Sequence, residues 1–201
     1  MPLIGALRWF SHNEGPGFHP HTPVFIAQSA YLRLVEHAGS DLESEVGGIL
    51  VGNWSIDAES HQQFIVIETA LSARFTRQGS VYLTFTQDSL VDLHADLDEH
   101  YPGKQIVGWY HTHPGMGVFL SSHDAWLHRH FFPEPWQVAL VIDPKSATAG
   151  FFIRQADGVL DPGRCFGFYE LDGSSGQSCV RWNNLKPDSE AIDDKGAYLD
   201  E

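Results

Sequence analysis

The sequence predicts one domain of the α+β class, in which a single sheet is covered by helices. Two observations predict it: short apolar and β-branched runs of strand length recur along the chain, and between them lie stretches whose apolar residues have helical spacing. The chain has 201 residues, of which 42% are hydrophobic and 19% charged, enough for one domain with a sizeable core. No internal repeat or low-complexity block divides it.

The two ends of the chain differ in composition from its middle. Residues 1–23 contain a dense run of glycine and proline, which predicts an extended N-terminal arm. From residue 173 onward the sequence becomes rich in serine and glycine and then acidic, which predicts a loosely held tail over 173–201. We therefore expect the folded domain to occupy residues 24–172.

Three stretches have the apolar spacing of an amphipathic helix. The first covers 29–37, with Ser29 as a cap at its start and Gly39 as its stop. The second covers 88–100 and has leucines on one face and carboxylates on the other. The third covers 121–132, is short, and is followed by prolines.

The expected strands are apolar, β-branched or aromatic runs bounded by turn signals. They are residues 46–51, 64–67, 81–85, 106–110, 137–142, 150–154 and 165–171. Turns are expected between Gly52 and His61, at Asp143-Pro144 and at Asp157-Gly158.

Charge and composition restrict the classes of partner. The net charge is −14, with only 12 lysines and arginines, so the phosphates of a nucleic acid would be repelled and neutral or basic partners are favoured. No run approaches the ~18 apolar residues of a membrane span, and the N-terminus lacks the pattern of a signal peptide. Cys165 and Cys179 form no framework, so we expect free thiols in a reducing cytoplasm.

The strand expected over 106–110 leads directly into His111-Thr112-His113-Pro114. Residues two apart in extended backbone point to the same side, so both imidazoles can reach one ion. Pro114 fixes φ and removes a donor, which ends the strand. Any one histidine in a chain that holds 12 is more often a surface or satisfied core residue, so the pair alone is a weak signal.

Ser121 and Asp124 follow at the start of the third expected helix. Their spacing is that of a capping box, and the positive helix end favours an ionised Asp124. Capping and metal binding are compatible, because a helix start beside the histidine pair presents a hydroxyl and a carboxylate at one point. His111, His113 and Asp124 then supply three of the four ligands of a catalytic zinc, one ion per chain, with the last position open for water.

Glu45 is the acid that we assign as the general base. A lone glutamate is usually solvated, but this one lies at the mouth of the apolar strand 46–51, whose glycines permit close approach of another backbone. Zinc lowers the pKa of its water towards ~7, and a carboxylate beside that water can take the proton and deliver it to a leaving amine.

These residues together resemble the motif of a known family. The pattern His-x-His-Pro…Ser-x-x-Asp, the preceding Val-Gly-Trp-Tyr and the upstream Glu-Val-Gly-Gly-Ile-Leu-Val-Gly are similar to the JAMM motif of the MPN/JAB metalloproteases. The resemblance implies the MPN/JAB (cytidine-deaminase-like) three-layer fold, a curved and mostly antiparallel sheet with helices on both sides. It also implies a compact member of the prokaryotic type.

The same resemblance implies an activity and a set of roles. His111, His113 and Asp124 would bind zinc, Glu45 would activate water and Ser121 would help to stabilise the oxyanion. The enzyme would be an isopeptidase or processing peptidase that acts at the C-terminus of a ubiquitin-like protein or its conjugates, with E1- and E2-like proteins as further partners. The acidic body suits a basic substrate tail.

Two segments are candidates for the walls of a peptide groove. The loop 115–120 is apolar, and we expect Met116 and Phe119 to contact an extended peptide there. The segment 73–80, with Arg74 and Arg77, is the candidate for the opposite wall or a lid, although an ordinary surface hairpin accounts for it equally well.

Other interpretations of the same residues stay open. A peptidase that trims the tail of a sulfur-carrier protein in cysteine or cofactor biosynthesis would use the same site. A non-catalytic MPN scaffold is disfavoured, because such proteins typically lack the metal ligands that this chain retains. A zinc nucleotide deaminase is disfavoured too, since the Pro-Cys-x-x-Cys half of its signature is missing.

Overall fold

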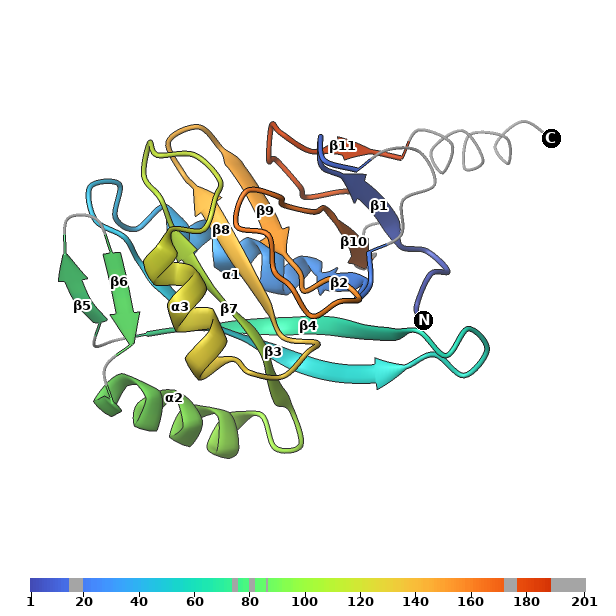
Figure 1. Ribbon diagram of the computed structural model, residues 1–201, viewed down its shortest axis with the longest axis horizontal. Helices are drawn as coiled ribbons and strands as arrows, with labels where there is room; N and C mark the ends of the chain where they lie inside the picture. The colour runs from blue at the N-terminus through green and yellow to red at the C-terminus, as the bar shows by residue number, and fades with distance from the viewer. Residues whose placement is uncertain (15–19, 74–75, 80–81, 86, 172–176, 189–201) are drawn as a thin grey trace.

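The computed structural model describes residues 1–14, 20–73, 76–79, 82–85, 87–171 and 177–188. Most of the strands form one nine-stranded sheet in the order β11-β1-β10-β2-β4-β3-β7-β8-β9 (Figure 1). Its strands are β1 (Leu7–Phe10), β2 (Val24–Ala27), β3 (Gly47–Ile56), β4 (Gln63–Ser72), β7 (Gln105–Thr112), β8 (Val138–Asp143), β9 (Thr148–Phe152), β10 (Phe168–Leu171) and β11 (Lys186–Pro187). Five of its eight pairings are antiparallel, which confirms the expected mostly antiparallel sheet.

Helices cover both faces of this sheet. α1 (Gln28–Ala38) lies behind it in Figure 1, and α3 (Ser122–Phe131) lies in front. Successive side chains of a strand point to opposite faces. Leu50 and Tyr110 therefore belong to the core under α1, whereas Ile49 and Trp109 belong to the core under α3 and α2 (Gln87–His100). The expected three-layer arrangement is confirmed.

A small hairpin stands apart from the main sheet. It consists of β5 (Thr76–Gly79) and β6 (Tyr82–Phe85), which pair antiparallel, and β6 contacts α3. The strand expected over 81–85 thus exists, but it pairs within this hairpin.

Two segments near the ends of the chain, within residues 1–14 and 177–188, are more ordered than composition predicted. Residues 15–19 of the expected arm, and 173–176 and 189–201 of the expected tail, lie outside the described residues. The expected arm over residues 1–23 is wrong for β1, which pairs with β10 and β11 in the main sheet. The expected loose tail is wrong for the part over 177–188, because Val180, Trp182 and Leu185 are buried in the core under α1. These apolar residues are separated by polar ones, so an average over the segment conceals them.

Two local predictions also fail. The cap residue of α1 is Ala27, without a side-chain hydrogen bond, because β2 runs straight into the helix and leaves no turn for Ser29. β3 continues to Ile56, so Gly52 lies within a strand and not at a turn. A Cβ at Gly52 would lie 1.8 Å from the carbonyl oxygen of Val66, so only glycine allows β4 to approach there. Among the described residues, no helix is long and apolar enough to cross a bilayer.

Candidate metal centre

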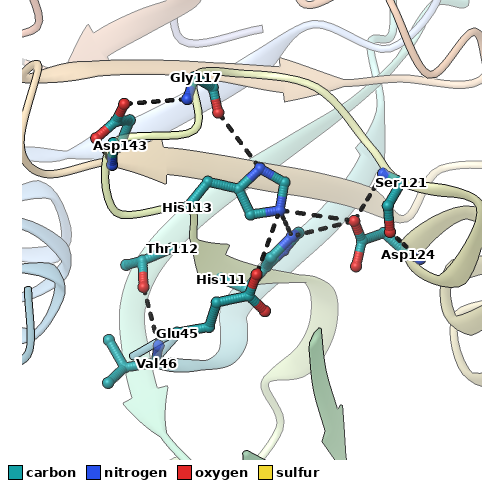
Figure 2. A network of polar contacts seen from close by, with 10 residues as sticks. Glu45, Val46, His111, Thr112, His113, Gly117, Ser121, Asp124 and Asp143 are labelled. Atoms are coloured by element: carbon teal, nitrogen blue, oxygen red, sulfur yellow. Dashed lines mark hydrogen bonds and ion pairs between the residues drawn. The ribbon is translucent and has the colours of Figure 1, made fainter. Parts of the chain in front are cut away.

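β7 delivers both histidines to one place. This strand lies between β3 and β8, and its end carries His111, which is fully buried, and then His113, which is 3% exposed. The two rings are nearly perpendicular, at 76°, and their Nε2 atoms lie 3.0 Å apart (Figure 2). The expectation that residues two apart on this strand share a side is therefore met.

The start of α3 brings Asp124 to the same point. Ser121 is the cap residue: its Oγ accepts a hydrogen bond from the Asp124 amide at 3.2 Å, and its own amide donates to Asp124 Oδ2 at 2.7 Å. The predicted capping box is confirmed. The same Oδ2 lies 3.5 Å from His111 Nε2 and 3.7 Å from His113 Nε2, so one carboxylate both caps the helix and faces the histidines.

Strand register places Glu45 opposite His113. β3 pairs antiparallel with β7, and Gly47 is the partner of His111. Glu45 and His113 lie two residues beyond this pair, just outside the two strands, where hydrogen bonds between Val46 and Thr112 continue the pairing. Glu45 is 3% exposed, and its Oε1 lies 3.8 Å from His113 Nε2 (Figure 2).

Thr112 holds this end of β3 in place. Its Oγ1 accepts a hydrogen bond from the Val46 amide at 2.9 Å, and its amide donates to the Val46 carbonyl at 2.8 Å. Thr112 is fully buried and Val46 is half-buried, so these bonds are partly shielded from water. A Cβ at Gly48 would lie 2.0 Å from the carbonyl oxygen of Leu71, so the expected close backbone approach is present beside Glu45. No role could be predicted for Thr112 from the sequence, and the structure shows that it anchors Val46, the residue next to Glu45.

The protonation states of the cluster follow from its surroundings. His113 Nδ1 faces the carbonyl oxygen of Gly117 at 3.3 Å, and since a carbonyl can only accept, Nδ1 carries the hydrogen. In the neutral ring Nε2 is then the nitrogen that is able to bind a metal ion. Burial lowers the pKa of His111, although Asp124 opposes the shift. Burial acts to raise the pKa of Asp124, but the contacts with His111 and His113 outweigh it and hold that pKa well below its ordinary value.

The resulting group fits a metal ion. One ligand atom each from His111, His113 and Asp124 lies within 4.8 Å of the others. A tetrahedral ion with bonds of ~2.05 Å needs donors about 3.3 Å apart. The three measured separations of 3.0, 3.5 and 3.7 Å scatter around that value. Two imidazole nitrogens and a carboxylate oxygen that converge in a buried place are a donor set of the kind that a divalent cation binds.

His111 is held from behind by aromatic rings. Its imidazole stacks on the Trp109 indole, with ring centroids 4.6 Å apart and planes 8° from parallel. Trp109 Nε1 donates a hydrogen bond to His128 Nδ1 at 3.0 Å. Burial, with a smaller effect from the Arg154 charge, lowers the pKa of His128 to about 3, so its ring is neutral. No sequence signal distinguished His128 from the other histidines.

The expected groove residues are placed only in part. Phe119 and Met116 are each 39% exposed, and the Phe119 ring centroid lies 4.7 Å from that of His113, so Phe119 borders the metal centre. Arg74 lies outside the described residues. The backbone of Arg77 lies in β5, opposite Thr84.

A sheet with helices on both faces and a buried His-His-Asp group beside a glutamate define an α+β domain with a candidate metal site. The family described as JAB1/Mov34/MPN/PAD-1 ubiquitin protease matches residues 20–132. The chain belongs to this family, as its motif residues predicted.

Two curated relatives and one solved structure illustrate the range of similar proteins. The chain is 33% identical to the NAD(+) hydrolase TcpA of Theionarchaea archaeon over 68% of its own length and 40% of that protein. It is 27% identical to ubiquitin carboxyl-terminal hydrolase RPN11 of Saccharomyces cerevisiae over 70% of its length and 44% of that protein. The chain thus spans less than half the length of these relatives. Protein DSY2949 from Desulfitobacterium hafniense shares the fold, with a TM-score of 0.53 at 19% identity, over 77% of this chain and 99% of that one.

Proposed function

We propose that the protein is a zinc-dependent isopeptidase or peptidase that cleaves at the C-terminus of a ubiquitin-like protein, either to mature its precursor or to remove it from targets. One observation carries the proposal. Two imidazole nitrogens and a carboxylate oxygen converge in a buried place, and the carboxylate of Glu45 lies 3.8 Å from one of them. The name of the yeast relative, a ubiquitin carboxyl-terminal hydrolase, supports the substrate class.

Zinc is the ion that this donor set favours. Catalytic zinc sites use three protein ligands of the His and carboxylate type and keep one position open. Zinc bound by His111, His113 and Asp124 would supply Lewis acidity and bring the pKa of a water molecule towards neutrality. The low pKa of Asp124 and of His111 favours the metal-binding protonation states near neutral pH.

Glu45 and Ser121 would move and stabilise charge at the reacting carbonyl. Glu45 Oε1 would take a proton from the attacking water and deliver it to the leaving amine, because it lies 3.8 Å from His113 Nε2 and so beside the proposed metal. Ser121 Oγ accepts from the Asp124 amide, so its hydroxyl hydrogen stays available to an oxyanion. Loss of one such donor typically lowers kcat by about 10²–10³.

The surroundings of the site support an extended substrate segment, and the charge of the whole chain supports a basic one. Phe119 and Met116 offer exposed apolar surface on one side, and Arg74 and Arg77 remain candidates for the other. The net charge of −14 favours a basic tail. Further expected partners are E1- and E2-like proteins of a bacterial ubiquitin-like conjugation system. The free cysteines Cys165 and Cys179 are consistent with the cytoplasm.

The test is cleavage of a ubiquitin-like protein that carries a C-terminal extension, followed by mass spectrometry with and without a chelator. Glu45→Gln should keep zinc and lose turnover by about 10²–10⁴. The matched control is Glu43→Gln, two residues away, whose side chain is 87% exposed and pairs with Lys145. It should cleave like the parent. Cleavage that ignores the chelator, or a Glu45→Gln protein of near-parental rate, would contradict the proposal.

The same assay separates the remaining candidates. A sulfur-carrier protein with an extended tail belongs in the substrate panel, because a peptidase that trims it would use the same side chains. NAD⁺ belongs there too, since the archaeal relative is named for its hydrolysis, although the match covers 40% of that protein. Elemental analysis addresses a scaffold function: a protein purified without roughly stoichiometric zinc, and unable to take it up, would favour the scaffold.

A further inference from the structure

A buried carboxylate at the end of β8 gathers the loop that follows the histidine pair. Asp143 is 2% exposed and accepts hydrogen bonds from four backbone amides. Those of Gly115 and Gly117 lie at 2.8 and 3.1 Å, and those of Lys145 and Ser146 at 3.0 and 3.3 Å. One side chain thus ties the loop after β7 to the turn after β8.

The loop itself has a defined shape. The Met116 amide donates to the His113 carbonyl at 3.1 Å, which closes a turn with Pro114 and Gly115 at its centre. Gly115 has φ +78°, the left-handed value that the third position of a type II turn requires. Gly117, also left-handed at φ +87°, then turns its carbonyl towards His113 Nδ1 while its amide faces Asp143 (Figure 2).

We propose that Asp143 is a positioning residue for the metal centre: it holds the Gly115 and Gly117 amides, aims the Gly117 carbonyl at His113, and so fixes the Nδ1–H tautomer of that ring. His113 Nε2 is then the nitrogen that faces His111 and Asp124. Metal-bound histidines generally depend on such a partner at their other nitrogen. The inference rests on the metal site proposed above and adds a residue that touches none of its ligands directly.

The charge of Asp143 makes it suited to this role. Burial acts to raise its pKa, but the hydrogen bonds from Gly115, Ser146 and Gly117 outweigh that effect and keep the pKa below its ordinary value. An ionised carboxylate accepts shorter and stronger hydrogen bonds from amides than a neutral acceptor does. An asparagine of the same shape would turn an N–H group towards the amides and lose one side of the clamp.

The experiment reads the tautomer directly. Long-range ¹H–¹⁵N spectra of the metal-free protein, at about pH 9 and so above the ordinary histidine range, should show His113 as Nδ1–H in the parent and as a mixture in Asp143→Asn. Zinc affinity, measured by competition with a chromogenic chelator, should fall by about 10–100-fold. Asp157→Asn is the matched control, because Asp157 caps an exposed turn by accepting from the Val159 amide at 2.9 Å. It should change neither readout.

Gly117→Ala, with Gly158→Ala as its control, tests the same inference if Asp143→Asn does not fold. Gly117 and Gly158 have φ +87° and +78°, and an added Cβ meets nothing within 4 Å at either. Alanine therefore strains both backbones alike, but only Gly117 presents its carbonyl to His113. Gly117→Ala should weaken zinc binding about tenfold, and Gly158→Ala should bind like the parent.

Parental tautomer and parental zinc affinity in both Asp143→Asn and Gly117→Ala would overturn the inference. A parent protein that binds no zinc would overturn the proposed function instead. The His113 tautomer in the metal-free variants would still decide the role of Asp143.

Discussion

The two histidines of the metal centre are held in different ways. His113 is fixed by polar groups, through the Gly117 carbonyl and the amides that Asp143 gathers. His111 is fixed by stacking on Trp109, and its Nδ1 has no hydrogen-bond partner in the described part of the chain. A hydrogen bond specifies which nitrogen carries the proton, whereas a stacked ring specifies only the plane of the imidazole. The chain therefore defines the tautomer of one ligand and the orientation of the other.

Removal of the Trp109 ring, on which His111 stacks, should have the largest effect. Trp109 is fully buried, so Trp109→Ala should lower the free energy of unfolding by about 3–5 kcal/mol through lost contacts and a cavity. It should also weaken zinc binding, since the His111 ring loses its backing. Urea unfolding measures the first effect, with Trp126→Ala as the control: Trp126 lies on α3 and is 47% exposed, so its loss should cost well under 1 kcal/mol. Equal losses in the two variants would contradict the argument.

The second effect is the sensitivity of the aromatic side to acid. The pKa of His128 is about 3 in the folded protein and ~6.5 in the unfolded chain. Between these two values only the unfolded chain takes up the proton. Stability is thus present above the unfolded value and is lost as the pH falls. Between pH 7 and 5 the parent should lose about 2 kcal/mol more than His128→Asn, whose oxygen still accepts from Trp109 without titrating. Parallel stability curves for the two proteins would rule this out.

A third change weakens the polar side without touching a ligand. Thr112→Val keeps the shape of the side chain but leaves the Val46 amide without the hydroxyl that it donates to. The half-buried amide left without a partner should cost about 1 kcal/mol of stability. Turnover should fall while zinc stays bound, because Glu45 loses its anchor. Thr112→Ser should restore both kinetics and stability, and a zinc-depleted Thr112→Val protein would show that this residue serves the ligands instead.

The smallest expected effect comes from Lys145, where the roles of the backbone amide and of the side chain can be separated. Lys145 gives its amide to Asp143, while its ammonium group pairs with Glu43 at 3.2 Å on the surface. An exposed pair contributes at most about 1 kcal/mol. Lys145→Ala should therefore leave zinc affinity unchanged and lower the melting temperature slightly, an effect that disappears in high salt. A large drop in affinity would mean that the lysine charge, and not the amide, supports the loop.

The residues that could be predicted are those whose role is written in local spacing. His111 and His113 share a side of one strand, and Ser121 and Asp124 share one helical turn, so their proximity within each pair follows from backbone geometry alone. Glu45 lies far away in the sequence, and its role is indicated by the apolar strand beside it and by the family motif. Asp143 gave only a turn signal, because its function depends on which amides the fold brings near its carboxylate.

The same limit explains the errors at the chain ends. β1 and β11 are short strands whose identity depends on their partners, since a strand of two or four residues carries no usable periodicity. Trp182 is buried because it packs against Tyr31 on α1, with ring centroids 4.8 Å apart. The average composition of the segment is polar, so the burial of Trp182 can be seen only once Tyr31 is known to pack against it.

The register shifts on either side of β3 determine how the domain tolerates insertions between β3 and β4. Opposite the Leu50–Gly52 level, β4 skips Glu68 and β7 skips Val107, so each neighbour has one surplus residue at the same height of the sheet. Such bulges absorb a change of phase and increase the local twist. The register of the half of β3 that leads to Glu45 is thereby independent of the register of the half that ends in the turn at residues 57–62. Insertions in that distant turn can accumulate while the acid keeps its partner across the strand.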